Sequence, residues 1–202
     1  MSAESIPVSE PGAQPKPASE SAESERRPLS DLLPTGELLM VVAGAAVVAV
    51  VGSFARYGLH GRAFVGAVFC PTLILLAAID LKHKLLPNAI ILPASLAVGL
   101  IVAASTPGDF LSHLAAGAAL GGFFFLFGAL FAGSLGMGDA KLGFLLGLAL
   151  GARTLGATLI AFAGLLVAAL YILASRGASA RKDTIPFGPF LALGGILAFF
   201  LH

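Results

Sequence analysis

Long apolar runs, separated by short joints that carry charge or proline, occupy the chain from residue 38 onward. Six of them approach the ~20 residues that an α-helix needs to cross a hydrocarbon core, and the run at 142–152 would cover roughly half of that thickness. The pattern predicts an all-α fold, a polytopic transmembrane helical bundle with six to seven membrane segments. The expected helices lie at 38–54, 63–79, 89–105, 114–135, 142–152, 155–175 and 185–201.

The first 37 residues lack this pattern. They hold seven of the eleven acidic residues and six of the twelve prolines, a composition typical of disorder. A signal peptide is not expected, because no basic segment followed by an apolar run occurs there. We predict a disordered cytoplasmic tail at 1–37 and a transmembrane domain at 38–202.

The basic residues predict an orientation, because short cytoplasmic loops collect Lys and Arg. With seven crossings and a cytoplasmic tail, the inside joints are the richer ones; if the short run did not cross, this bias would mostly vanish. Seven crossings are therefore favoured. The inside joints would hold Lys82, Lys84, Lys141, Arg176, Arg181 and Lys182, and the outside joints Arg56, Arg62 and Arg153.

Composition supports a membrane protein and narrows its chemistry. The chain is 57% hydrophobic and 11% charged, and its net charge is only +1, so neither a soluble domain nor a nucleic-acid partner is expected. Cys70 is the single cysteine, which excludes an internal disulfide and a multi-cysteine zinc site. A histidine-based site is not favoured either, because the four histidines are far apart in the sequence and form no metalloprotease or serine-hydrolase motif.

Carboxylates are scarce after Glu37, where only four aspartates remain. Asp109 reads as a turn residue and Asp183 as a loop charge. Asp80 and Asp139 directly abut membrane runs, where an ionisable group is costly and points to function. Because the third and fourth runs cross out and back between them, both aspartates should emerge on the same side.

Two close carboxylates cannot both ionise cheaply, so such a pair holds one proton. The ionised member can take a proton from water while the protonated one donates to a carbonyl, which is peptide hydrolysis without a metal. Each residue also has a structural explanation. Asp139 could be the N-cap of a helix that starts near Ala140, with Gly136 and Gly138 as turn residues, and Asp80 could be a polar helix end.

Three segments together resemble the type IV prepilin peptidase family, membrane aspartic proteases with a Gly-x-Gly-Asp motif. The first has an aspartate followed by Pro-Asn, the second has the Gly-Met-Gly-Asp-x-Lys-Leu pattern, and the third opens the last apolar run. They are Asp80-Leu-Lys-His-Lys-Leu-Leu-Pro-Asn88, Gly136-Met-Gly-Asp-Ala-Lys-Leu142 and Ile185-Pro-Phe-Gly-Pro-Phe190.

The resemblance implies that Asp80 and Asp139 are catalytic and that Gly136, Gly138 and Lys141 belong to the supporting motif. The substrate would be a type IV prepilin or a pseudopilin of a pilus or type II secretion system, cut after the glycine that ends a short basic leader. Its hydrophobic segment would stay in the bilayer. The enzyme would lie in the bacterial inner membrane, with its active site facing the cytoplasm, and would need no cofactor.

Many family members also carry a methyltransferase region with paired Cys-x-x-Cys motifs, which this sequence lacks. We therefore expect peptidase activity without N-methylation. The sequence leaves two other functions to consider. A proton-coupled transporter or channel could use paired aspartates, but it needs access from both sides. A catalytically silent assembly protein would have no reason to keep both carboxylates.

Overall fold

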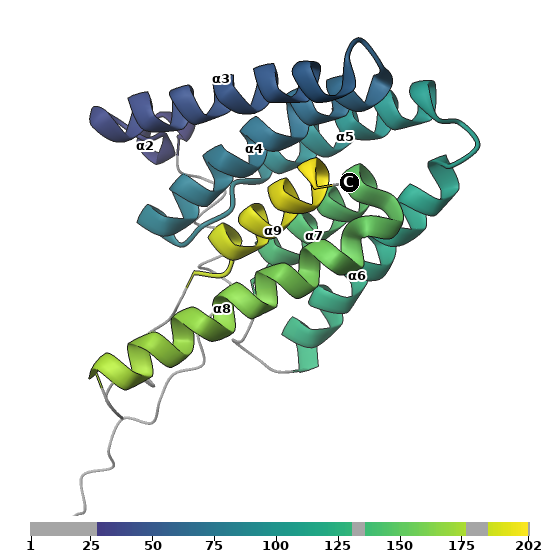
Figure 1. Ribbon diagram of the computed structural model, residues 1–202. Coiled ribbons are helices and arrows are strands. Elements are labelled where there is room, and N and C mark those ends of the chain that lie inside the picture. Colours follow the sequence, from purple (N-terminus) through teal and green to yellow (C-terminus); the bar gives the residue numbers. More distant parts are fainter. Residues whose placement is uncertain (1–27, 131–135, 177–185, 202) are drawn as a thin grey trace, which may run out of the picture.

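In the computed structural model, residues 28–130, 136–176 and 186–201 are described, and the regular structure among them is entirely helical (Figure 1). The prediction of an all-α bundle is confirmed for these residues. The helices in chain order are α2 (Leu29–Leu32), α3 (Glu37–Tyr57), α4 (Gly61–His83), α5 (Asn88–Ser105), α6 (Phe110–Leu130), α7 (Met137–Leu150), the 3-10 helix η1 (Gly151–Arg153), α8 (Thr154–Arg176) and α9 (Gly188–Phe200).

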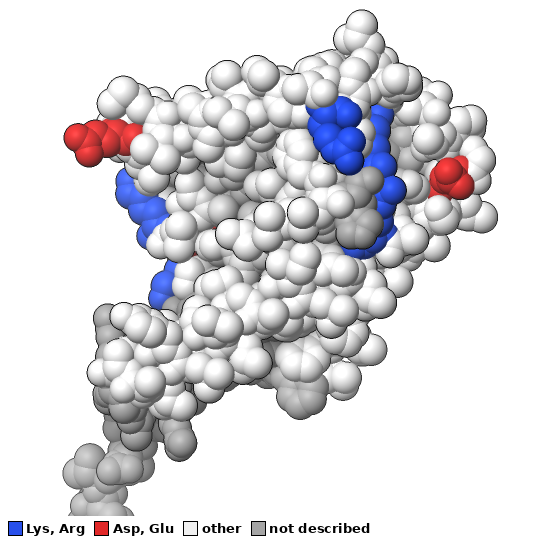
Figure 2. All heavy atoms as spheres, viewed as in Figure 1, with Lys and Arg blue, Asp and Glu red and all other residues white. Residues whose placement is uncertain are grey.

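Five segments are long and apolar enough to cross a membrane, and α9 is a shorter apolar helix. The last of the five, Met137–Ser175, contains both α7 and α8. Charged side chains gather toward the two ends of the bundle, and the middle of the visible surface is largely free of them (Figure 2). This distribution is that of a multi-pass membrane protein.

Of the tail predicted at 1–37, residues 1–27 lie outside the described residues. The part that follows contains α2, and Leu32 in it is buried with 2% of its surface exposed.

The helix α7, with 14 residues, lies in the middle of the bundle. It begins at Met137, five residues before the apolar run at 142–152, so it is longer than that run predicted. Nearly all its residues from Ala140 to Leu150 are buried. The chain turns at η1, where Gly151 has a φ of 58°, and α8 runs back along the bundle (Figure 1).

Glycines let α6 and α7 approach until their backbones touch. A Cβ atom built on Gly147 would lie 2.3 Å from the Cα of Gly117, and one on Gly121 would lie 2.9 Å from the carbonyl oxygen of Ala140. Close backbone approach of this kind is how helices pack when lipid competes for apolar contacts. It fixes α7 along α6.

The helix α9 packs between α4 and α8, so the aspartate end of the bundle collects segments distant in sequence. The helices α6 and α8 continue toward this end past the points where they contact α7 and α9. Gly121 meets Ala140, but α6 extends to Leu130; a Cβ on Gly164 would lie 3.3 Å from Phe190, but α8 extends to Arg176. The beginnings of α7 and α9 are therefore set back from the ends of α6 and α8.

Candidate active site

Asp80 lies one turn before the end of α4 and is buried, with 6% of its surface exposed. Its Oδ2 accepts a hydrogen bond of 3.0 Å from the backbone N–H of Gly188, the first residue of α9. The first N–H groups of a helix have no partner within it and favour a negative group. Asp80 is thus a polar residue at a helix end, and its carboxylate is in addition held by a helix more than a hundred residues away.

Asp139 lies in the first turn of α7 and is half-buried. Its Oδ2 accepts a hydrogen bond of 3.1 Å from the backbone N–H of Gly136, the N-cap residue. Gly136 has no side chain to return the bond, so this is one half of a capping box. The alternative of Asp139 as an N-cap is thus wrong in position, since the helix begins before it, although its carboxylate does serve that helix end.

Both carboxylates lie at the same end of the bundle, Asp80 in the last turn of α4 and Asp139 in the first turn of α7, where Gly138 meets Leu86. Each accepts an N–H from the beginning of a helix, α9 for Asp80 and α7 for Asp139. The parity argument from the sequence predicts this shared end. Two carboxylates so placed can exchange protons with a substrate and with water.

Contacts between the second half of the first motif and the start of α7 join the two aspartate segments. The Nζ of Lys141 donates a hydrogen bond of 2.6 Å to the Oδ1 of Asn88, the first residue of α5. A Cβ on Gly138 would lie 2.7 Å from the Cβ of Leu86, so a glycine allows this close approach. Gly136 and Gly138 thus serve loop and helix-start geometry, and Lys141 ties α7 to α5.

Two participants were missed as site residues by sequence reasoning, Gly188 and Asn88. Both lie inside segments that carry the resemblance, so a signal for them was present. The sequence could not say that Gly188 holds Asp80, since that depends on how α9 packs against α4. Among the residues that the structure describes, no three His, Cys, Asp or Glu side chains form a group that could hold a metal ion.

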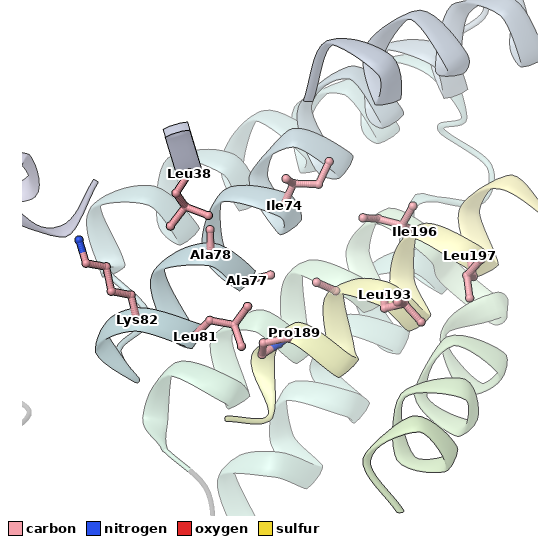
Figure 3. Close-up of a pocket in the computed structure, with 11 residues that line it drawn as sticks. Leu38, Ile74, Ala77, Ala78, Leu81, Lys82, Pro189, Leu193, Ile196 and Leu197 are labelled. Atoms are coloured by element: carbon pink, nitrogen blue, oxygen red, sulfur yellow. The ribbon is translucent and has the colours of Figure 1, made fainter. Parts of the chain in front are cut away.

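A groove with a volume of about 540 Å³ lies between α4 and α9, and some of its lining residues neighbour Asp80 and Gly188 in the sequence. Figure 3 shows the lining side chains on the two helices, with Leu81 of α4 next to Pro189 of α9 and Leu38 of α3 above Ala78. Leu81 and Lys82 follow Asp80 directly, and Pro189 follows Gly188. Its lining residues are Leu38, Ile74, Ala77, Ala78, Leu81, Lys82, Pro189, Ala192, Leu193, Ile196 and Leu197.

The contact between Gly188 and Asp80 leads to a prediction. In Gly188→Ala, the new Cβ would lie 2.6 Å from Oδ2 of Asp80, so the carboxylate has to move. We expect any activity that depends on Asp80 to fall about tenfold or more, because a small misplacement of a reacting group is costly. The thermal stability of the detergent-solubilised protein should change little. Gly156→Ala, a position with open space in α8, is the matched control; equal activity in both variants would contradict the role of this contact.

These features define the class of protein. It is a multi-pass helical membrane protein with a pair of carboxylates at one end. A sequence model of the type IV leader peptidase family matches residues 67–173, more than half of the chain, and includes both aspartates. The chain belongs to the type IV leader peptidase family.

Curated relatives agree with this assignment. A prepilin leader peptidase/N-methyltransferase of Bacillus subtilis (strain 168) is 35% identical over 180 residues, which cover 85% of this chain and 66% of the relative. A protein with the same name from Burkholderia pseudomallei (strain 1026b) is 34% identical over 171 residues, which cover 80% of this chain and 53% of the relative. The chain thus spans between about half and two thirds of the length of these relatives. No solved structure matches it.

Proposed function

We propose that this chain is a membrane aspartic endopeptidase that removes the short basic leader from type IV prepilins or pseudopilins. One observation carries the proposal: Asp80 and Asp139, far apart in the sequence, lie at the same end of the bundle, each bonded to a helix beginning. The family match and the names of the relatives support this reaction.

In the proposed reaction the two carboxylates share one proton. The ionised carboxylate takes a proton from a water molecule as the water oxygen bonds to the peptide carbonyl carbon, and the protonated carboxylic acid donates its proton to the carbonyl oxygen. The tetrahedral intermediate then loses its C–N bond as the nitrogen takes the proton from the carboxyl group that deprotonated the water, and the other carboxylate takes a hydroxyl proton from the intermediate. Peptide and water become a carboxylic acid and an amine, and the pair returns to its starting state.

We place the protein in the bacterial inner membrane, with the aspartate end toward the cytoplasm. The distribution of basic residues in the joints of the sequence supports this orientation. Lys82, Lys84 and Lys141 all lie near the aspartates in the sequence. A leader still in the cytoplasm would then meet the carboxylates where the substrate enters the membrane.

The groove beside Asp80 is the proposed site for the hydrophobic segment of the substrate. A bond between a leader and an apolar segment needs an apolar surface that starts at the catalytic groups and runs into the bilayer. The groove meets this need, because its lining runs along α4 from Lys82 to Ile74 and along α9 from Pro189 to Leu197 (Figure 3).

Filling this groove should weaken cleavage. In Leu193→Trp, a larger side chain occupies the space in which Leu193 now lies (56% exposed). We expect an increase in KM of about tenfold for a full-length prepilin, the effect of losing about 1.4 kcal/mol of binding. Leu96→Trp, at an exposed α5 position outside the groove (65%), is the control. An equal KM in the two variants would exclude the groove as the substrate site.

The direct test is co-expression with a prepilin and detection of the shortened product by mass spectrometry. The mass should fall by that of the leader, and sequencing should find a new N-terminus at the start of the hydrophobic segment. An intact prepilin beside a folded, membrane-inserted enzyme would contradict the proposal.

A further inference from the structure

Three arginines from two joints of the sequence lie at the end of the bundle opposite the aspartates. Arg56 is in the last turn of α3, Arg62 in the first turn of α4, and Arg153 in η1. The guanidinium groups of Arg62 and Arg56 lie 4.8 Å and 5.6 Å from the centroid of the Tyr57 ring, and Arg153 lies at the same end of the bundle, in the turn after α7. Basic side chains are gathered on this part of the surface in Figure 2.

Tyr57 also fixes this arginine cluster, Arg56, Arg62 and Arg153, at the end of α9. Its hydroxyl donates a hydrogen bond to the carbonyl oxygen of Phe199, and Arg62 lies 5.8 Å from the centroid of the Phe199 ring. A helix C-terminus carries roughly half a negative charge, whereas three guanidinium groups carry three full positive charges. The end of α9 therefore offsets only a small part of the charge.

Acidic side chains of the described residues do not supply the remaining negative charge that would balance the three arginines. Within the described residues, no ion pair links the cluster to Asp or Glu. Arg56 lies over the ring of Tyr57, and Arg62 lies over the rings of Tyr57 and Phe199. Like charges held together repel each other, so an arrangement of this kind favours a bound anion. Arginine suits a phosphate in particular, because its planar fork can donate two parallel hydrogen bonds.

The surroundings indicate the source of the phosphate. Next to the cluster lie apolar side chains exposed on the outside of the bundle: Val51 (61%), Leu59 (84%) and Phe64 (45%). Arg56 and Arg62 stand at the ends of two membrane-spanning helices, which is the level of lipid headgroups. Basic pockets at this level between transmembrane helices can hold anionic headgroups.

We propose that Arg56, Arg62 and Arg153 bind the phosphate of an anionic phospholipid in the leaflet opposite the aspartates, with its acyl chains against the adjacent apolar surface. This site is separate from the proposed peptidase site, and its test does not depend on cleavage. Arg62 lies against the rings of Tyr57 and Phe199 and so holds its place in the cluster, and Arg56 and Arg153 provide the remaining charge.

Native mass spectrometry of the full chain tests this proposal. The purified protein is titrated with phosphatidylglycerol and, separately, with phosphatidylcholine of the same acyl chains. The wild type should bind phosphatidylglycerol about tenfold more tightly, and Arg56→Gln/Arg153→Gln should lose that preference, since each cation near a phosphate contributes measurably to affinity. Lys82→Gln/Lys84→Gln removes the same number of charges at the other end and should keep the preference.

A second variant separates charge from folding. Arg56→Lys/Arg153→Lys keeps both charges without the planar fork, so it should retain part of the preference for phosphatidylglycerol. An equal affinity for both lipids in the wild type, or an unchanged preference in the Gln variant, would overturn the proposal. Displacement of the lipid by millimolar inorganic phosphate would also overturn it, because the site would then be one for a soluble anion.

Discussion

Replacing either Asp80 or Asp139 by asparagine should lower the rate of leader removal by about 10³-fold or more, within the range found for loss of a proton-transferring group. Asparagine has nearly the shape of aspartate, and its side-chain oxygen can still accept the N–H of Gly188 or Gly136. It cannot take a proton from water. The fold should therefore persist while the chemistry stops.

The measurement is a time course of prepilin cleavage with purified variants in detergent, at equal protein concentration. Asp109→Asn is the matched control, because this exposed aspartate lies in the turn between α5 and α6 and takes no part in the proposed reaction. It should cleave at the wild-type rate. Because paired groups act as a unit, the double variant should be about as slow as either single one. Cleavage that survives either substitution would exclude the carboxylate pair.

The second large effect concerns stability. In Gly147→Ala, the new Cβ would lie 2.3 Å from the backbone nitrogen and Cα of Gly117 and 2.4 Å from the backbone carbon of Ala116. These atoms belong to a helix backbone and cannot turn aside, so α6 and α7 must separate. Overpacking of this kind costs about 1–3 kcal/mol or more, and the midpoint of thermal unfolding should fall by about 5 °C or more.

Gly122→Ala provides the comparison on the same pair of helices. Gly122 is exposed on α6, and a Cβ there meets nothing within 4 Å. Its thermal midpoint should stay near the wild-type value or rise slightly, since alanine favours a helix. If both variants unfold at the same temperature, the backbone contact between α6 and α7 does not stabilise the protein as described.

The helices were predictable because apolar runs of membrane length can be recognised in the sequence without knowledge of tertiary contacts. The beginning of α7 was not, since Gly136-Met-Gly reads locally as a turn. Met137 is exposed, and the bond from the N–H of Gly136 to Asp139 closes this first turn. The shared end of Asp80 and Asp139 was predictable from the number of crossings alone. Their catalytic roles remain predictions.

Contacts between distant segments could not be predicted. Gly188 and Asp80 are 108 positions apart, and Lys141 and Asn88 are 53 apart. The arginine cluster shows the same limit, because Arg153 lies in a different joint from Arg56 and Arg62. Pairing of this kind depends on helix rotation and tilt, which follow from the packing of side chains in the folded bundle.

The helices α6 and α8 continue past the beginnings of α7 and α9, and this limits the side from which water can reach the carboxylates. From the contact of Gly121 with Ala140, α6 continues for roughly 14 Å, and from the contact of Gly164 with Phe190, α8 continues for roughly 18 Å, at 1.5 Å per residue. These ends expose Leu130 and Tyr171. Lipid tails can therefore extend on that flank beyond the depth of the carboxylates. In the reaction proposed above, water would then reach the carboxylates from the α4 and α5 side.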